Sequence, residues 1–162
     1  MCAAIEFNDA PIYFKDAPRL PVLCRDGSVR WIQWGHPYGA KDARAPQGAC
    51  ARIESIHAGK WRKYHPRPVK IVASAFMERD HKKAPHWFAI AAGQFIQGAL
   101  IEVAGEAAAG DAERHYIVYV VTEAAAADVA RIHERQPRLI ASDSPNDERD
   151  QILPRQPLQT DE

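Results

Sequence analysis

The sequence has few cysteines and no long hydrophobic segment. Its three cysteines, Cys2, Cys24 and Cys50, are an odd number at spacings that suit neither a disulfide framework nor a zinc site. No apolar run approaches the roughly 18 residues that a membrane span needs. The first nine residues lack the basic segment of a signal or transit peptide. These absences predict a soluble protein of a reducing compartment, the cytoplasm, with no membrane partner.

The sequence also lacks the spacings of common metal and phosphate motifs. Its seven histidines form no His-x-x-x-His pair, and there is no Cys-x-x-Cys pair. There is no glycine-rich phosphate loop and no Gly-x-Ser-x-Gly turn for a serine nucleophile. We therefore expect neither a metal nor a cofactor.

The charges that are present are unevenly distributed. The 162 residues carry 21 basic and 21 acidic side chains, but residues 19–83 hold 14 Lys and Arg against five Asp and Glu, a net charge of +9. Such a segment is either a solvated surface or a surface that faces a polyanion. The four tryptophans, at positions 31, 34, 61 and 87, lie in this basic segment or beside it. Aromatic rings among cations suit single-stranded nucleic acid, although a position in the core is the competing explanation.

Alternating apolar residues and turn signals predict a β-rich α+β domain. An Asp-Gly turn at Arg25–Ser28 joins two of the expected strands. An alanine-rich helix is expected over residues 123–134, and residues 50–56 suit a helix or a strand equally. The domain should cover residues 1–140, with a disordered tail over 141–162. The expected strands are 20–24, 29–34, 69–77, 86–92, 98–103, 115–121 and 138–140.

Cys2 carries the most distinctive chemistry in the chain. Removal of Met1 would give an amino-terminal cysteine, whose amine can form an imine with an aldehyde and whose thiol can then close a thiazolidine ring. The reference pKa of an α-amine, about 7.7–8.0, leaves part of it nucleophilic at neutral pH. Taken alone, a chain that begins Met-Cys can also arise by chance.

Two further residues suit proton transfer. Glu78 ends an apolar strand, where burial can raise the pKa of a carboxyl, and His133 lies near the end of the expected helix. Taken singly, a surface ion pair for Glu78 and a helix-capping role for His133 are the simpler explanations. Arg52 and Glu54 are either a phosphate-binding residue with its orienting partner or a plain surface ion pair.

In order along the chain, several segments resemble the SOS-response-associated peptidase (SRAP) family of abasic-site processing proteins. The start, Met1-Cys2-Ala3-Ala4, is similar to the family's Met-Cys-Gly-Arg, and Cys50-Ala51-Arg52-Ile53-Glu54-Ser55 is similar to its Asn-Ala-Arg-x-Glu-Thr. The other matching segments are Pro21-Val22-Leu23, Trp34-Gly35-His36-Pro37, Val72–Arg79 and Ile132–Pro137.

The resemblance implies coiled, mostly antiparallel sheets with a few helices. It further implies a protein that binds single-stranded DNA and becomes covalently linked to abasic sites through the thiazolidine of Cys2. Glu78 and His133 would then assist proton transfer and opening of the sugar ring. The DNA-binding residues implied are Arg52, which would contact the backbone, together with Trp34, Cys50 and Glu54.

Several positions depart from the family pattern. Cys50 stands where the family has Asn, Ala4 where it has Arg, Ala3 where it has Gly, and Arg79 where it has Trp. Three functions therefore remain open. These are covalent capture of abasic sites in single-stranded DNA, non-catalytic binding of single-stranded DNA by a degenerate site, and cleavage of its own amino terminus or of a peptide by a cysteine.

Overall fold

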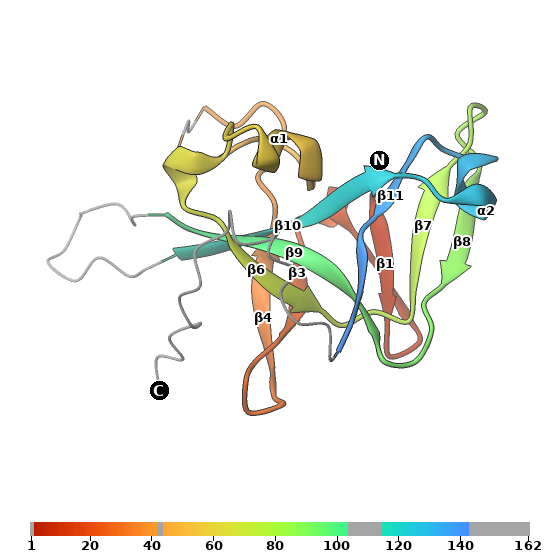
Figure 1. Cartoon of the computed structure of the whole chain (residues 1–162), viewed down its shortest axis with the longest axis horizontal. Helices are drawn as coiled ribbons and strands as arrows, with labels where there is room; N and C mark the ends of the chain where they lie inside the picture. Colours follow the sequence, from red (N-terminus) through yellow and green to blue (C-terminus); the bar gives the residue numbers. More distant parts are fainter. Residues whose placement is uncertain (1, 42–43, 104–114, 143–162) are drawn as a thin grey trace, which may run out of the picture.

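The computed structural model describes residues 2–41, 44–103 and 115–142. Within these residues the chain forms two β-sheets and two short helices (Figure 1). All strand pairs are antiparallel except those that β10 makes with β4 and β5. This confirms the expected β-rich α+β class with mostly antiparallel sheets.

The smaller sheet has four antiparallel strands in the order β2-β1-β7-β8. These are β1 (Ala4–Phe7), β2 (Ala10–Tyr13), β7 (Ala75–Arg79) and β8 (Pro85–Ala89). Prolines near the start of a chain are typical of irregular structure, but here the segment forms the two regular strands β1 and β2. Because β2 lies at the edge of the sheet, Pro11 is tolerated there, although it has no N–H to donate.

The larger sheet runs in the order β11-β10-β4-β3-β6-β9-β12 and closes into a ring, because β9 also pairs with β10. Gly98 of β9 permits close packing within this ring. A Cβ atom there would lie 2.9 Å from side-chain atoms of Ile71, Val118 and Val69. The strands of this sheet are β3 (Arg19–Leu23), β4 (Val29–Trp34), β5 (Cys50–Arg52), β6 (Arg67–Ile71), β9 (Gln94–Val103), β10 (His115–Ala124), β11 (Arg135–Pro137) and β12 (Leu139–Ala141).

Two expected elements are wrong. The strand predicted over residues 69–77 is in fact two strands, β6 and β7, which belong to different sheets. The helix predicted over residues 123–134 shrinks to α2 (Ala127–Ala130), because β10 continues to Ala124 and pairs with β11. The alanines have high helix propensity, but strand pairing overrides it.

The segment that suited helix or strand equally forms both, since β5 is followed by α1 (Ile53–His57). Short 3-10 turns lie at Phe14–Asp16, after β2, and at Arg62–Tyr64, after α1. β12 extends one residue past the expected domain boundary, to Ala141. Residues 143–162, most of the expected tail, lie outside the described residues, so the expected disorder stays a prediction.

The main hydrophobic core lies between the two sheets. It contains side chains of both, including Ile5 and Phe76 of the smaller sheet and Trp34 and Val118 of the larger one, and Cys2 belongs to it. A second cluster lies between α1 and the ring and includes Ile56, Trp61 and Tyr119. The amino-terminal cysteine is therefore anchored where the two sheets meet.

Candidate active site and nucleic-acid groove

Four of the residues singled out from the sequence meet at the junction of the two sheets. Ala4 of β1 pairs with Met77 of β7, which brings Cys2 near Glu78. Cys50, at the start of β5, donates a hydrogen bond from its thiol to the main-chain oxygen of Cys2 at 3.5 Å. His133, between α2 and β11, has its Nδ1 atom 3.7 Å from Oε2 of Glu78. The cysteine–glutamate cluster consists of these four residues, Cys2, Cys50, Glu78 and His133.

The cysteine–glutamate cluster is electrostatically unusual because most of it is buried. Cys2 and Glu78 have no exposed surface. Burial raises the pKa of the Cys2 thiol well above its usual value, and the neighbouring Cys50 and Glu78 raise it further. Burial also raises the pKa of Cys50, to about 12, and raises the pKa of Glu78, while the charge of His133 opposes the shift at Glu78. Both thiols are therefore held protonated, and the Glu78 carboxyl is placed to hold and release a proton.

Arg52 and Glu54 form the surface ion pair that was one of the two expectations, but Glu54 also has a second partner. The Arg52 side chain is 66% exposed, and its Nε lies 3.9 Å from Oε2 of Glu54. Glu54 makes its main contact with Arg135 instead, through two hydrogen bonds of 2.8 Å. Glu54 therefore joins α1 to β11, and Arg52 is left available to a phosphate.

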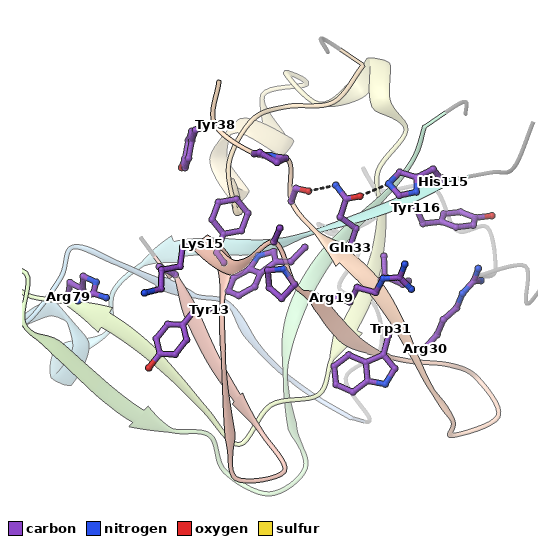
Figure 2. A pocket seen from close by; sticks show the side chains of 18 residues that line it. Tyr13, Lys15, Arg19, Arg30, Trp31, Gln33, Tyr38, Arg79, His115 and Tyr116 are labelled. Atoms are coloured by element: carbon purple, nitrogen blue, oxygen red, sulfur yellow. Dashed lines mark hydrogen bonds between the residues drawn. The ribbon is translucent and has the colours of Figure 1, made fainter. Parts of the chain in front are cut away.

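A groove of about 870 Å³ is lined by residues of both sheets (Figure 2). Ala3 and Arg79 line it, and these are the neighbours of Cys2 and Glu78 in the chain. Its other charged side chains are Lys15, Arg19 and Arg30, and none of its described lining residues is acidic. Exposed aromatic rings accompany these cations: Trp31 is 45% and Tyr38 59% exposed. Cations interleaved with exposed rings suit a single-stranded polyanion whose bases can stack.

The two tryptophans of β4 differ in exposure. Trp31 is exposed at the groove, where its ring meets the edge of Phe7 at a centroid distance of 5.3 Å. Trp34 also contributes to the groove lining, but it is only 1% exposed and donates from its indole N–H to the main-chain oxygen of Ala49 at 3.0 Å. This burial argues against the expected stacking of Trp34 on DNA bases, and Trp31 offers the exposed ring instead.

Neither metal ligation nor a membrane span has support in the part of the chain that the structure describes. No group of three or more His, Cys, Asp and Glu side chains there is arranged to hold a metal ion. No helix in the same residues is long and apolar enough to cross a membrane.

Comparison with known proteins identifies the family. The family model described as SOS response associated peptidase (SRAP) matches residues 8–158. The chain belongs to the SRAP family. A solved structure of a protein from Bacteroides thetaiotaomicron shares the fold, with a TM-score of 0.67 and 15% sequence identity over 96% of this chain and 76% of that one. No curated protein matches the sequence.

Membership of the SRAP family associates the chain with the response to DNA damage. Sequence reasoning gave no role to two features of this SRAP protein. Arg135 was part of the matched segment Ile132–Pro137, but its partner Glu54 lies 81 positions earlier, so no local spacing could reveal the pair. The groove cations Lys15, Arg19 and Arg30 come from three different segments, and only the overall positive charge of residues 19–83 hinted at two of them.

Proposed function

We propose that this protein binds single-stranded DNA and captures abasic sites covalently through an amino-terminal Cys2. The observation that carries the proposal is the buried cysteine–glutamate cluster, together with a basic, aromatic groove lined by Ala3 and Arg79, the chain neighbours of Cys2 and Glu78. Cys2 would supply the reacting groups, Glu78 and His133 would move protons, and Arg52 with the groove cations would hold phosphates. The chemistry requires that Met1 be removed, because only then does Cys2 carry a free amine.

The proposed reaction joins the amine and then the thiol of Cys2 to the sugar aldehyde of an opened abasic site. The amine adds to the carbonyl carbon, and loss of water gives an imine. The sulfur then bonds to the imine carbon while the thiol proton goes to the nitrogen, which closes the thiazolidine. Because burial raises the pKa of the Cys2 thiol, this proton has to be removed as the ring closes. Glu78 and His133 are the neighbouring groups able to accept and return it.

One specific observation favours a second candidate function, binding of single-stranded DNA without capture. Cys50 replaces the family's Asn beside Cys2, and a thiol is a weaker hydrogen-bond donor and acceptor than an amide. A captured sugar would be held less firmly by such a site. The groove does not depend on this position, so binding of intact strands would survive the change.

Incubation of the purified protein with abasic and intact oligonucleotides separates these functions. A slower band on a denaturing gel, formed only with abasic DNA and lost in Cys2→Ser, is the result expected for covalent capture. Binding on a native gel without a denaturation-resistant band would indicate the binding-only function. Cleavage of the protein or of a peptide in the absence of DNA would indicate a peptidase. Intact-mass measurement of the same sample should show loss of Met1, and full retention would overturn the thiazolidine mechanism.

A further inference from the structure

Glu54 and Arg135 form the best-aligned ion pair near the cysteine–glutamate cluster. Both carboxylate oxygens of Glu54 accept hydrogen bonds of 2.8 Å from the Arg135 guanidinium. The guanidinium also donates from Nη2 to the main-chain oxygen and the hydroxyl of Thr122, at 2.9 and 3.2 Å. The bonds from Arg135 lower the pKa of Glu54 to about 2. The pair therefore ties α1, β10 and β11 together at one point.

The main chain of the same arginine holds the ring of His133. Its N–H donates to Nδ1 of His133 at 3.0 Å, and its carbonyl oxygen lies 3.1 Å from the same nitrogen. An unprotonated Nδ1 accepts from the N–H, whereas a protonated Nδ1 donates to the carbonyl oxygen. Arg135 thus offers Nδ1 a partner in either protonation state. Oε2 of Glu78 lies 3.7 Å from this nitrogen.

We propose that Glu54 is a positioning residue for proton transfer between Glu78 and His133. By holding the Arg135 side chain, Glu54 keeps the Arg135 main chain against Nδ1. In the transfer, the O–H bond of the Glu78 carboxyl breaks and an N–H bond forms at Nδ1, which leaves a carboxylate beside an imidazolium. The reverse step restores both neutral groups, so the proton and charge balance without any other reactant.

The use of this proton transfer in covalent capture rests on the proposed function, whereas the contacts among Glu54, Arg135 and His133 do not. The competing explanation is that the pair only fastens α1 to β11. In that case the loss of Glu54 would lower stability without changing the state of the His133 ring. In serine hydrolases a carboxylate sets the tautomer of a histidine directly. In this protein, the Glu54 carboxylate would act on His133 indirectly, through the main chain of Arg135.

The variant Glu54→Gln keeps the shape of the side chain and removes its charge. The matched control is Glu102→Gln, because Glu102 of β9 also pairs with an arginine, Arg67, at 3.6 Å. Nitrogen NMR of the histidine ring in the free protein reports directly which ring nitrogen of His133 carries a proton. We expect wild type and Glu102→Gln to favour an unprotonated Nδ1 in the neutral ring, and Glu54→Gln to show a mixture of tautomers.

Reaction with abasic DNA supplies the second measurement. At saturating DNA, the cross-linking rate of Glu54→Gln should fall about tenfold, as expected for small misplacements of catalytic groups, and its pH profile should shift. Glu54→Asp, which retains the charge, should recover part of the rate and also serves if the Gln variant does not fold. Unchanged His133 resonances in both Glu54 variants would overturn the inference. If the resonances change but the wild type forms no cross-link, the proposed function fails and the positioning role of Glu54 stands.

Discussion

Replacing Glu78 with Gln tests whether burial keeps this carboxyl neutral in the folded protein. Glu78 has no exposed surface, and burial raises its pKa from the ordinary value of 4.5. Gln has nearly the same shape but cannot ionise. The difference in the free energy of unfolding between wild type and Glu78→Gln therefore isolates the cost of placing a charge at this position.

The sign of the pH dependence follows from the direction of the pKa shift. As the pH rises past 4.5, the unfolded chain releases the Glu78 proton while the folded chain retains it. Between that pH and the folded-state pKa, the folded chain binds more protons, so wild-type stability falls relative to Glu78→Gln. The fall amounts to at most about 1.4 kcal/mol per pH unit. For a chain of this size, each kcal/mol corresponds to about 2–4 °C in melting temperature.

Urea denaturation of both proteins at steps from about pH 2 to pH 8 measures this difference. We expect the stability advantage of Glu78→Gln to grow with pH and to level off at the folded-state pKa of Glu78. For Glu54→Gln, the pH dependence of the stability difference from wild type should have the opposite sign, because Arg135 lowers the pKa of Glu54 to about 2. The contribution of Glu54 is present above pH 4.5 and is lost as the pH falls towards 2. A constant difference between wild type and Glu78→Gln over the whole range would refute the reasoning.

Four further predictions concern the proposed reaction and the groove. Cys2→Ser should lose the covalent product on denaturing gels while its affinity for intact single strands, measured by fluorescence anisotropy, stays near that of wild type, since a hydroxyl cannot close the thiazolidine. Arg52→Ala should weaken binding equally for all base sequences and reduce the log–log salt slope by about 0.7, the contribution of one phosphate contact; an unchanged slope would mean that Arg52 touches no phosphate. Cys50→Asn should speed cross-linking or prolong the product several-fold, because one recovered neutral hydrogen bond contributes about 1 kcal/mol, and equal time courses in reductant would contradict this. Trp31→Ala should weaken strand binding through the loss of about 1–3 kcal/mol of base stacking, whereas Trp87→Ala, at a position of similar exposure (41% against 45%), should not; equal losses would count against the groove.

Local patterns located most strands but not the connections between them. The strand Val29–Trp34 has the predicted bounds, because alternation and the Asp-Gly turn are signals contained within a few residues. The predicted strand over residues 69–77 crosses from one sheet to the other, and a continuous apolar run carries no mark of that crossing. The alanine-rich segment looked helical because alanine has a high helix propensity. Its first residues form a strand instead because they pair with β11, which lies outside the segment.

The residues of the candidate site also differ in whether the sequence alone could identify them. Cys2, Glu78 and His133 were identified because each has a distinctive reactivity and a place in the family's order of motifs, and the structure brings them together. Trp34 was assigned to DNA binding from the family resemblance, but only the packed structure shows that its side chain is 1% exposed. The link from Glu54 to Arg135 depends on how α1 docks beside β11, which no spacing within either segment contains.

The two sheets contribute to the cysteine–glutamate cluster in equal parts. Cys2 and Glu78 belong to the smaller sheet, by way of β1 and β7, whereas Cys50 and the segment before β11 take their places from pairing with β10 of the larger one. Neither sheet alone holds a complete set of reacting groups. The cluster is therefore complete only when the two sheets are packed against each other. A species with full strand content but separated sheets would keep the amine and thiol of Cys2 and could still condense with a free aldehyde, but Cys50 and His133 would no longer lie beside them. The pH dependence of ring closure, rather than reactivity towards an aldehyde as such, would therefore report on the docking of the sheets.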